Sequence, residues 1–380
     1  MIQIEIDGLR YDGFTNASIK RSMDTMCASY SLTCTAKTGK AFPIQRSKPV
    51  KIIVEGEVVL TGYVENLKVD YSATRHNIII SGRGRTCDLI DSSLTGVKEF
   101  NAPISLEAII NKVLLDNGLS EIQVINQAGA LDMFRADEIV AAEVGQTVFE
   151  FIEKFARKRQ VFLGEDGNGN LLLLRAGVED SGTALLNLIN GSSNNIISAS
   201  VSYNETNRFN RYTVHSQLNT KGLNKKVNGK KTSAKYNAEQ LTAQTGSAYD
   251  SEIRTTRVKE IVADTSSSSQ DSTQQAIWNA NVARARSSEF NCSVQGFKKS
   301  PNTIWKVNQL VKVEDHFCDV NAILLINTVE YSLSVESGST TAITCVVKDA
   351  YTLQSELDAQ EKKANVQGDG NKAPLVWKDF

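Results

Sequence analysis

The chain has 380 residues, and its 42 lysines and arginines are balanced by 43 aspartates and glutamates, which gives a net charge of −1. This balance excludes a surface that is basic overall, as in proteins that bind nucleic acid or anionic lipid non-specifically. The apolar content of 41% is that of a soluble globular protein, and no apolar run approaches the roughly 20 residues that cross a bilayer. The length predicts two or three domains, each large enough to bury its own core.

Two further features predict that the chain folds in a cytoplasm. The N-terminal run MIQIEIDGLR is typical of a strand rather than a signal peptide, because Glu5 and Asp7 interrupt its apolar residues. The cysteines show no C-x-x-C spacing and mostly alternate with polar residues, which predicts reduced, buried thiols rather than disulfides or metal ligands. These cysteines are Cys27, Cys34, Cys87, Cys292, Cys318 and Cys345.

Residues 1 to about 95 predict a small β domain. Ile2, Ile4 and Ile6 alternate with polar neighbours, as a half-buried strand requires. Further short apolar runs follow, separated by polar hairpin turns. Such a meander is typical of a small barrel or sandwich. We therefore predict a first β-barrel domain over 1–95, completed by a returning strand near 197–215.

In the middle of the chain, the spacing of apolar residues becomes that of an amphipathic helix. Ser105 is a candidate N-cap for a helix whose apolar side chains share one face. Thr147 and Glu150 form a capping-box pattern ahead of a second amphipathic helix. A hairpin over 161–174 follows, and we predict an α/β domain over 96–195.

The rest of the chain predicts an insertion, a second β domain and a tail. Residues 216–250 are polar and rich in lysine, which predicts an exposed insertion loop. A helix over 271–290 and strands over 291–350 follow, and we assign 251–352 to a second β-barrel domain. Residues 353–380 are charged and then contain Gly and Pro, which predicts a tail that orders only against a partner. The lysines of the loop are Lys221, Lys225, Lys226, Lys230, Lys231 and Lys235.

An internal repeat links the two predicted β domains. The runs Val50–Gly82 and Val311–Val346 both read as strand, turn, strand, Val-Glu, strand, polar turn and strand. A shared four-strand meander predicts that the two domains superpose and flank the α/β domain. The predicted fold class is therefore α+β, mostly β, with two similar small β-barrels, an exposed insertion loop and a C-terminal tail.

The stretch ISGRGRTCDLIDSS at Ile80–Ser93 has the composition of an active site, with two glycines, two arginines and two aspartates. It lacks the third glycine and the following helix of a dinucleotide-binding fingerprint, and no Gly-Lys-Ser/Thr follows for a phosphate-binding loop. Asp88 and Asp91 could share a helical face, but no nearby histidine or third carboxylate completes a metal set. The structural alternative is a corner, where a strand ends, the glycines allow a sharp turn and Thr86 caps a short helical turn. We favour the corner.

No other motif supplies a catalytic constellation. His76, His215 and His316 lack the spacing of a zinc or triad motif. Asp166–Asn170 looks like the start of a calcium loop but lacks the later glutamate, so a hairpin turn is favoured. The lysine-rich loop could contact phosphates, but it has few aromatics for stacking, so a solvated loop is favoured. We predict a protein that is not an enzyme and holds no cofactor or metal.

The order of these elements resembles the baseplate hub proteins of contractile phage tails, most closely the tail proteins of Mu-like phages. The late-control-D proteins, the T-even hub protein and the base of type VI secretion spikes are more distantly similar. The resemblance covers residues 1–352, with the lysine-rich loop as the least matched part. It rests on G-Y-V-E at Gly62–Glu65, the Ile80–Ser93 stretch, T-V-F-E-F-I-E-K-F-A-R-K-R at Thr147–Arg159, A-R-A-R at Ala283–Arg286, Trp305, V-K-V-E-D at Val311–Asp315 and L-L-I at Leu324–Ile326.

The resemblance implies a homotrimeric ring at the tail tip of a virion. In such proteins two barrel domains per chain alternate around the axis, and the resulting pseudo-sixfold ring lines a passage for viral DNA. The implied partners are the central spike protein, the tail tube and other baseplate proteins, without membrane insertion. Candidate contacts are Arg83, Arg85, Arg284, Arg286 and, in the tail, Trp377, with the six lysines as a candidate partner loop.

The charge balance adds one expectation to this resemblance. Because the chain has no excess of positive charge, we expect DNA to pass without tight binding, through a lumen of mixed or net acidic character. Two other functions stay open. A tail-associated cell-wall hydrolase would need paired carboxylates or a Cys/His set in a groove, and a host-surface-binding β module would need more exposed aromatics.

Overall fold

The structure is a computed structural model that describes residues 1–35, 44–72, 76–95, 99–101, 103–134, 140–143, 145–159, 161–177, 179–215, 226–227, 230–231, 245–262 and 269–351. The fold is mostly β, with few helices. Within these residues no helix is both long and apolar enough to cross a membrane. The chain divides into two compact units, Met1–Val201 with Phe290–Val346, and Ser202–Glu289 with the C-terminal residues from Val347.

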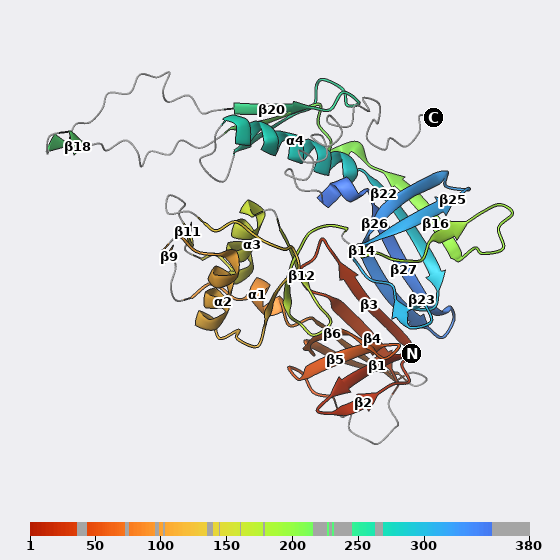
Figure 1. The fold of residues 1–380 in the computed structure, drawn as a ribbon. Coiled ribbons are helices and arrows are strands. Elements are labelled where there is room, and N and C mark those ends of the chain that lie inside the picture. Colours follow the sequence, from red (N-terminus) through yellow and green to blue (C-terminus); the bar gives the residue numbers. More distant parts are fainter. Residues whose placement is uncertain are drawn as a thin grey trace. The chain divides into compact units, whose positions relative to one another are not determined.

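The largest sheet has 11 strands, eight of which follow one another in the order β16-β22-β27-β26-β3-β4-β8-β7. We call this run the main sheet. Figure 1 shows its N-terminal strands β3 and β4, in red, beside its C-terminal strands β26 and β27, in blue. Its strands are β3 Asn16–Ser22, β4 Ser29–Cys34, β7 Asn66–Tyr71, β8 His76–Arg83, β16 Ile196–Tyr203, β22 Ser288–Gln295, β26 Val320–Ser334 and β27 Gly338–Val346.

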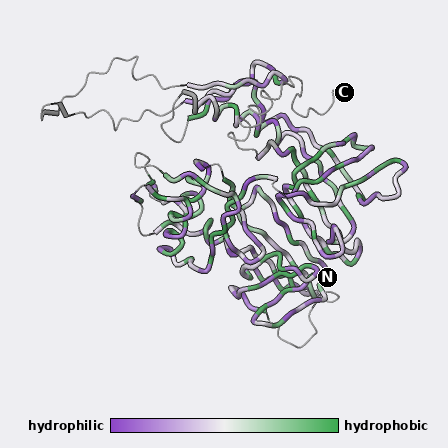
Figure 2. Tube along the Cα trace, in the orientation of Figure 1, coloured by the Kyte–Doolittle hydropathy of each residue, from purple (hydrophilic) through white to green (hydrophobic). Residues whose placement is uncertain are grey.

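Alternating side chains give the main sheet an apolar face and a polar face. Leu32 pairs with Ile80, and Val329 pairs with Ile343, and all four side chains are buried. Their sequence neighbours are at least partly exposed, and Figure 2 shows the same alternation as green and purple along the strands. Burial of the apolar face therefore specifies the register, because a slip of one residue would move every apolar side chain to the other face.

The two predicted β domains share this sheet, which corrects the expectation of two separate barrels flanking an α/β domain. Strand β26 pairs antiparallel with β27 on one side and with β3 on the other, from Thr328↔Ser22 to Ser334↔Asn16. A strand has hydrogen-bonding groups on both sides, so pairing with β27 leaves the other side of β26 free for the N-terminal strands. The described strands form no closed barrel.

The strand order shows a repeat that differs from the predicted one, because it includes strands outside Val50–Gly82 and Val311–Val346. One group consists of β3, β4, β7 and β8, and the other of β16, β22, β26 and β27. From the β7 end, the main sheet runs β7-β8-β4-β3 and then β26-β27-β22-β16. In both groups this is the third, fourth, second and first strand in chain order. The two groups therefore follow each other head to tail within one sheet.

Smaller strands complete the first unit. The four-stranded sheet β2-β1-β5-β6 contains the N-terminus, and β25 pairs with the first half of β26. Strands β14 and β15 pair with β25, so the predicted α/β domain over 96–195 ends earlier, before residue 179. The bounds are β1 Ile2–Ile6, β2 Leu9–Tyr11, β5 Pro49–Val54, β6 Glu57–Tyr63, β14 Glu179–Asp180, β15 Leu185–Asn187, β23 Lys298–Ser300, β24 Thr303–Ile304 and β25 Gln309–Asp315.

The helical region of the first unit has the caps expected from the sequence. The side chain of Ser105 accepts a hydrogen bond from the backbone at the start of α2, and Thr147 and Glu150 form a reciprocal capping box at the start of α3. Both helices share one apolar core with the sheet β10-β13-β12. The bounds are α1 Cys87–Asp91, α2 Leu106–Asp116, α3 Val148–Lys158, β9 Glu99–Phe100, β10 Val124–Asn126, β11 Val140–Ala141, β12 Phe162–Glu165 and β13 Leu171–Leu174.

The second unit is a three-stranded sheet packed on a helix. Strand β17 pairs antiparallel with β20 and parallel with β21, and α4 covers Tyr212 and Val214. A Cβ on Gly246 would lie 2.0 Å from the Thr273 nitrogen, so this glycine lets the helix approach the strand. The bounds are β17 Arg211–His215, β20 Thr245–Tyr249, β21 Val258–Val262, α4 Ser269–Ala285, η1 Glu205–Asn207 and η4 Lys348–Tyr351.

Three expectations for this region are wrong. The strand at 211–215 does not complete the N-terminal β domain, because it pairs with β20 and β21. Residues 245–249 are strand β20 rather than part of the insertion loop. The helix predicted over 271–290 ends at Ala285 and packs against β17 and β20 rather than within a second β-barrel. Alternating apolar residues fit any half-buried sheet, so the pattern could not select the partner strands.

Candidate assembly surfaces

The stretch around Gly84 is a structural corner. Gly62 and Gly84 form an isolated antiparallel bridge, and a Cβ on Gly62 would lie 1.9 Å from the Arg83 carbonyl oxygen. A Cβ on Gly84 would lie 2.2 Å from the carboxylate of Glu165. The glycines are therefore needed because two backbones and a carboxylate meet here. Thr86 precedes α1 but makes no side-chain cap hydrogen bond, so the predicted capping role is wrong.

Glu165 is the buried carboxylate at this corner, and the sequence analysis missed it. Its side chain accepts hydrogen bonds from the backbone N–H of Ala28 at 2.9 Å and of Thr86 at 3.5 Å. Arg21 donates to its backbone carbonyl. Burial raises the pKa of Glu165 to about 7, although the nearby Ala28, Arg21 and Thr86 groups oppose the rise. The signal in the sequence was the paired glycines, which mark a place where something approaches the backbone closely.

We expect Glu165 to make the stability of the first unit depend on pH. The folded-state pKa lies above the unfolded value, so this stabilisation is fully present below about pH 4.5 and is lost as the pH rises through 7. A shift of this size corresponds to about 3 kcal/mol of unfolding free energy. The difference in unfolding free energy between the wild type and Glu165→Gln, measured in urea, should therefore change by roughly 3 kcal/mol between pH 4.5 and 8. Exposed Glu121→Gln is the control, and parallel pH profiles for the wild type and Glu165→Gln would contradict the assignment.

Arg83 lies at the same corner between two carboxylates. Its Nη2 atom is 2.6 Å from Glu65 Oε1 and 2.6 Å from Asp91 Oδ2. Glu65, Cys87 and Asp91 offer ligand atoms within 4.8 Å of one another, which is compact enough for a metal ion. However, the guanidinium of Arg83 already pairs with both carboxylates and holds the pKa of Asp91 below its ordinary value, and burial raises the pKa of the Cys87 thiol to about 12. The arrangement is better suited to an ion-pair cluster than to metal binding.

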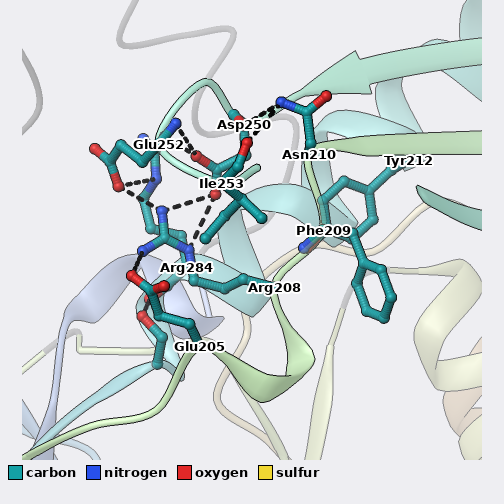
Figure 3. Close-up of polar contacts among 10 residues, drawn as sticks. Glu205, Arg208, Phe209, Asn210, Tyr212, Asp250, Glu252, Ile253 and Arg284 are labelled. Atoms are coloured by element: carbon teal, nitrogen blue, oxygen red, sulfur yellow. Dashed lines mark hydrogen bonds and ion pairs between the residues drawn. The ribbon is translucent and has the colours of Figure 1, made fainter. Parts of the chain in front are cut away.

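The second unit contains a buried ion-pair cluster, shown in Figure 3. Asp250 is 1% exposed and accepts hydrogen bonds from Arg208 Nη2 at 2.8 Å and from Arg284 Nη2 at 3.0 Å. Arg208 also contacts Glu252 and lies 3.6 Å from Glu205. These residues come from η1, the segment before β17, the segment after β20 and the last turn of α4. The cluster therefore ties together the chain segments that build this unit.

The remaining candidate contacts have different surroundings. Arg85 Nη1 donates to the Glu121 carbonyl at 3.2 Å, and the Arg286 guanidinium carbon lies 5.2 Å from the centre of the Tyr351 ring. Lys226, Lys230 and Lys231 belong to the short antiparallel pair β18 (Lys226–Val227) and β19 (Lys230–Lys231). Trp377, Lys221, Lys225 and Lys235 lie outside the described residues. None of these contacts tests a role at an interface, which stays a prediction for all the named residues.

The two edges of the main sheet expose apolar side chains. On β7, Val69 and Tyr71 are 53% and 80% exposed, and on β16, Ile197 and Tyr203 are 57% and 59% exposed. On β16 the apolar residues alternate with serines, and on β7 they alternate with Asn, Lys and Asp. Val69 pairs with the buried Ile78, so its side chain continues the apolar face. Open edges with such side chains are suited to pairing with another strand.

Three family models match successive parts of the chain. Residues 1–84 match the N-terminal domain of Mu phage baseplate assembly protein GpP-like, and residues 86–175 match the second domain of baseplate hub protein gp44-like. Residues 268–354 match the fourth domain of Mu phage baseplate assembly protein GpP. Together the three models cover about two thirds of the chain.

Known proteins match over nearly the whole chain. The baseplate hub protein gp44 of Escherichia phage Mu is 23% identical over 377 residues, which cover 97% of this chain and 93% of that protein. The crystal structure of the 43 kDa tail protein of prophage MuSo2 from Shewanella oneidensis has a TM-score of 0.76 at 26% identity, over 92% of this chain and 98% of that one. The tail protein from Neisseria meningitidis MC58 has the same fold, with a TM-score of 0.77 at 16% identity over 92% and 98% of the two chains.

The family models and the curated relative identify the chain as a structural protein of a bacteriophage tail. The chain belongs to the family of Mu-like baseplate hub proteins. The family predicted from the sequence motifs is thereby confirmed.

Proposed function

We propose that three copies of this chain close into a ring at the tail tip of a virion, where the ring joins the tail tube to the central spike and lets viral DNA pass. The role is structural rather than catalytic, and assembly takes place in the bacterial host cytoplasm. Other baseplate proteins would bind to this ring, with Trp377 and the six lysines as candidate contacts to them.

The observation that carries this proposal is the head-to-tail order of the two strand groups. At the junction inside the chain, β26 is the third strand of one group and β3 is the first strand of the other. Among the strands that the structure describes, the edges of the main sheet are β7, also a third strand, and β16, also a first strand. A β7 edge meeting the β16 edge of the next copy would therefore repeat the antiparallel β26·β3 junction.

This pairing would bury the exposed edge residues and close the sheet. Val69 and Tyr71 on β7 correspond in position to the β26 side chains that face the core beside β3. A heterologous contact of this kind gives either a closed ring or an open filament, depending on the rotation between copies. With three copies, the two groups per chain would produce a pseudo-sixfold ring, as the resemblance to hub proteins implies.

The proposal predicts a trimer in solution. Light scattering coupled to size exclusion should give three times the chain mass of 41.6 kDa at high protein concentration. A strictly monomeric or dimeric protein at that concentration would contradict the ring. Polymers without a limiting size would show that the edges pair without closing.

A further inference from the structure

The 11-stranded sheet has a further edge, on the branch that β25 forms beside the first half of β26. Strands β14 and β15 pair in parallel with β25, at Glu179↔Gln309 and at Leu185↔Val313. Among the described strands neither β14 nor β15 has a second partner, so the two form the outer edge of this branch. The backbone N–H and C=O groups of such an edge can pair with a strand of another chain.

The backbone groups that face the free side of β15 belong to every second residue. The Asn187 carbonyl accepts a hydrogen bond from the N–H of His316, so the groups of Asn187 face β25. Successive residues of a strand direct their backbone groups to opposite sides. Those of Ala184, Leu186 and Leu188 therefore face away from β25, and a strand added at this edge would have to pair with them.

Two consecutive asparagines already pair with these groups. The Leu186 N–H donates to Asn195 Oδ1 at 2.8 Å, and Asn195 Nδ2 donates to the Ala184 carbonyl at 2.8 Å. The backbone N–H of Asn195 donates to the Leu186 carbonyl at 3.1 Å. The Asn194 side chain accepts from the Leu188 N–H and donates to the Leu188 carbonyl, both at 2.9 Å. An amide side chain has the donor and the acceptor of a peptide group, so these two residues, which we call the asparagine cap, supply the hydrogen bonds of a neighbouring strand.

Two exposed apolar side chains lie near the capped edge. Ile189 is 64% exposed and Phe317 is 75% exposed. The Ile189 N–H donates to His316 Nδ1 at 3.4 Å, which holds the segment after β15 beside the turn that carries Phe317. Unpaired backbone groups next to exposed apolar side chains are typical of sites at which chains associate. Without the asparagine cap, this edge would therefore compete with β7 and β16 for strands of other copies.

We propose that Asn194 and Asn195 determine which edges of the 11-stranded sheet take part in assembly, because the asparagine cap closes the β15 edge to strand addition. The cap is joined to β15 by a short loop, so it competes for the edge at an effective concentration in roughly the millimolar range. A strand of another copy at micromolar concentration does not displace it. This inference goes beyond the proposed ring, since it concerns an edge that the ring does not use.

Light scattering coupled to size exclusion of the full chain tests the asparagine cap. The double variant Asn194→Ala, Asn195→Ala loses four side-chain hydrogen bonds to the segment around β15. Its uncapped edges should pair between copies, so at high concentration its mean mass should exceed that of the wild type by about twofold or more. The matched control is Ser193→Ala, an exposed residue of the same loop, which should have the mass of the wild type.

Adding Leu186→Pro to the double variant separates strand addition from a general loss of fold. Proline has no N–H, so it removes a donor that an added strand would need, and the mass should return to that of the wild type. A double variant with the wild-type mass at every concentration would overturn the inference, and so would extra association that persists with the proline. A monomeric wild type would contradict the proposed ring, whereas the comparison of the variants with the wild type would still test the cap.

Discussion

Replacing Val69 and Tyr71 on β7 with lysine should abolish the proposed trimer while leaving the fold of each chain intact. Both side chains are more than half exposed in the single chain, so lysine replaces no buried contact there. In the proposed ring they would be covered by the neighbouring copy. Burial of such a side chain contributes about 1.5 to 3 kcal/mol, so two of them at each junction should weaken association by a factor of about 100 or more.

The control for this experiment lies on the same strand. Asn66→Lys adds a positive charge to the polar side of β7 without removing an apolar side chain. It should leave the mass at that of a trimer. Tyr203→Lys on β16 should reproduce the dissociation, because it alters the other edge of the same junction. If the Val69→Lys, Tyr71→Lys double variant formed trimers with the same dissociation constant as the wild type, pairing through β7 would be ruled out.

Asp250→Asn will destabilise the second unit by about 3 to 5 kcal/mol, because it leaves the buried Arg208 without its principal counter-ion. The Arg208 side chain is 8% exposed and the Asp250 side chain 2% exposed, so water cannot replace the lost partner. Amide hydrogen exchange reports on the stability of each unit separately. Amides of β17 and β20 should exchange faster by a factor of at least 100, while amides of β3 and β4 should be unchanged.

Glu252→Gln is the matched control for the Asp250 variant. Glu252 also contacts Arg208, but its side chain is 51% exposed, so losing its charge should cost less than about 1 kcal/mol. Equal acceleration of exchange in the two variants would show that burial of Asp250 does not decide the strength of the cluster. Unchanged exchange in Asp250→Asn would show that the cluster does not stabilise the unit.

Local features of the chain were predictable from the sequence because neighbouring residues specify them. The caps of α2 and α3 depend on residues that lie within a few positions of each other, such as Thr147 and Glu150. The alternation of Ile2, Ile4 and Ile6 along β1 depends on a single strand in the same way. The order of such elements, with the motifs that they carry, was also sufficient to identify the hub family, since that order does not require knowledge of which strands pair.

The pairing of distant strands was decided only by the tertiary structure. Strands β26 and β3 are about 300 residues apart in the sequence. The residue pattern of one strand does not identify the other as its partner, because any half-buried strand shows the same alternation. The same ambiguity led to the wrong partner for β17. The burial of Glu165 and Asp250 was equally hidden, since a carboxylate becomes a buried partner only when the chain brings Gly84, Arg208 or Arg284 beside it. The sequence by itself therefore determined the family and the locally specified elements such as α2 and α3. Packing between remote segments determined the continuous sheet, its two edges and its polar face.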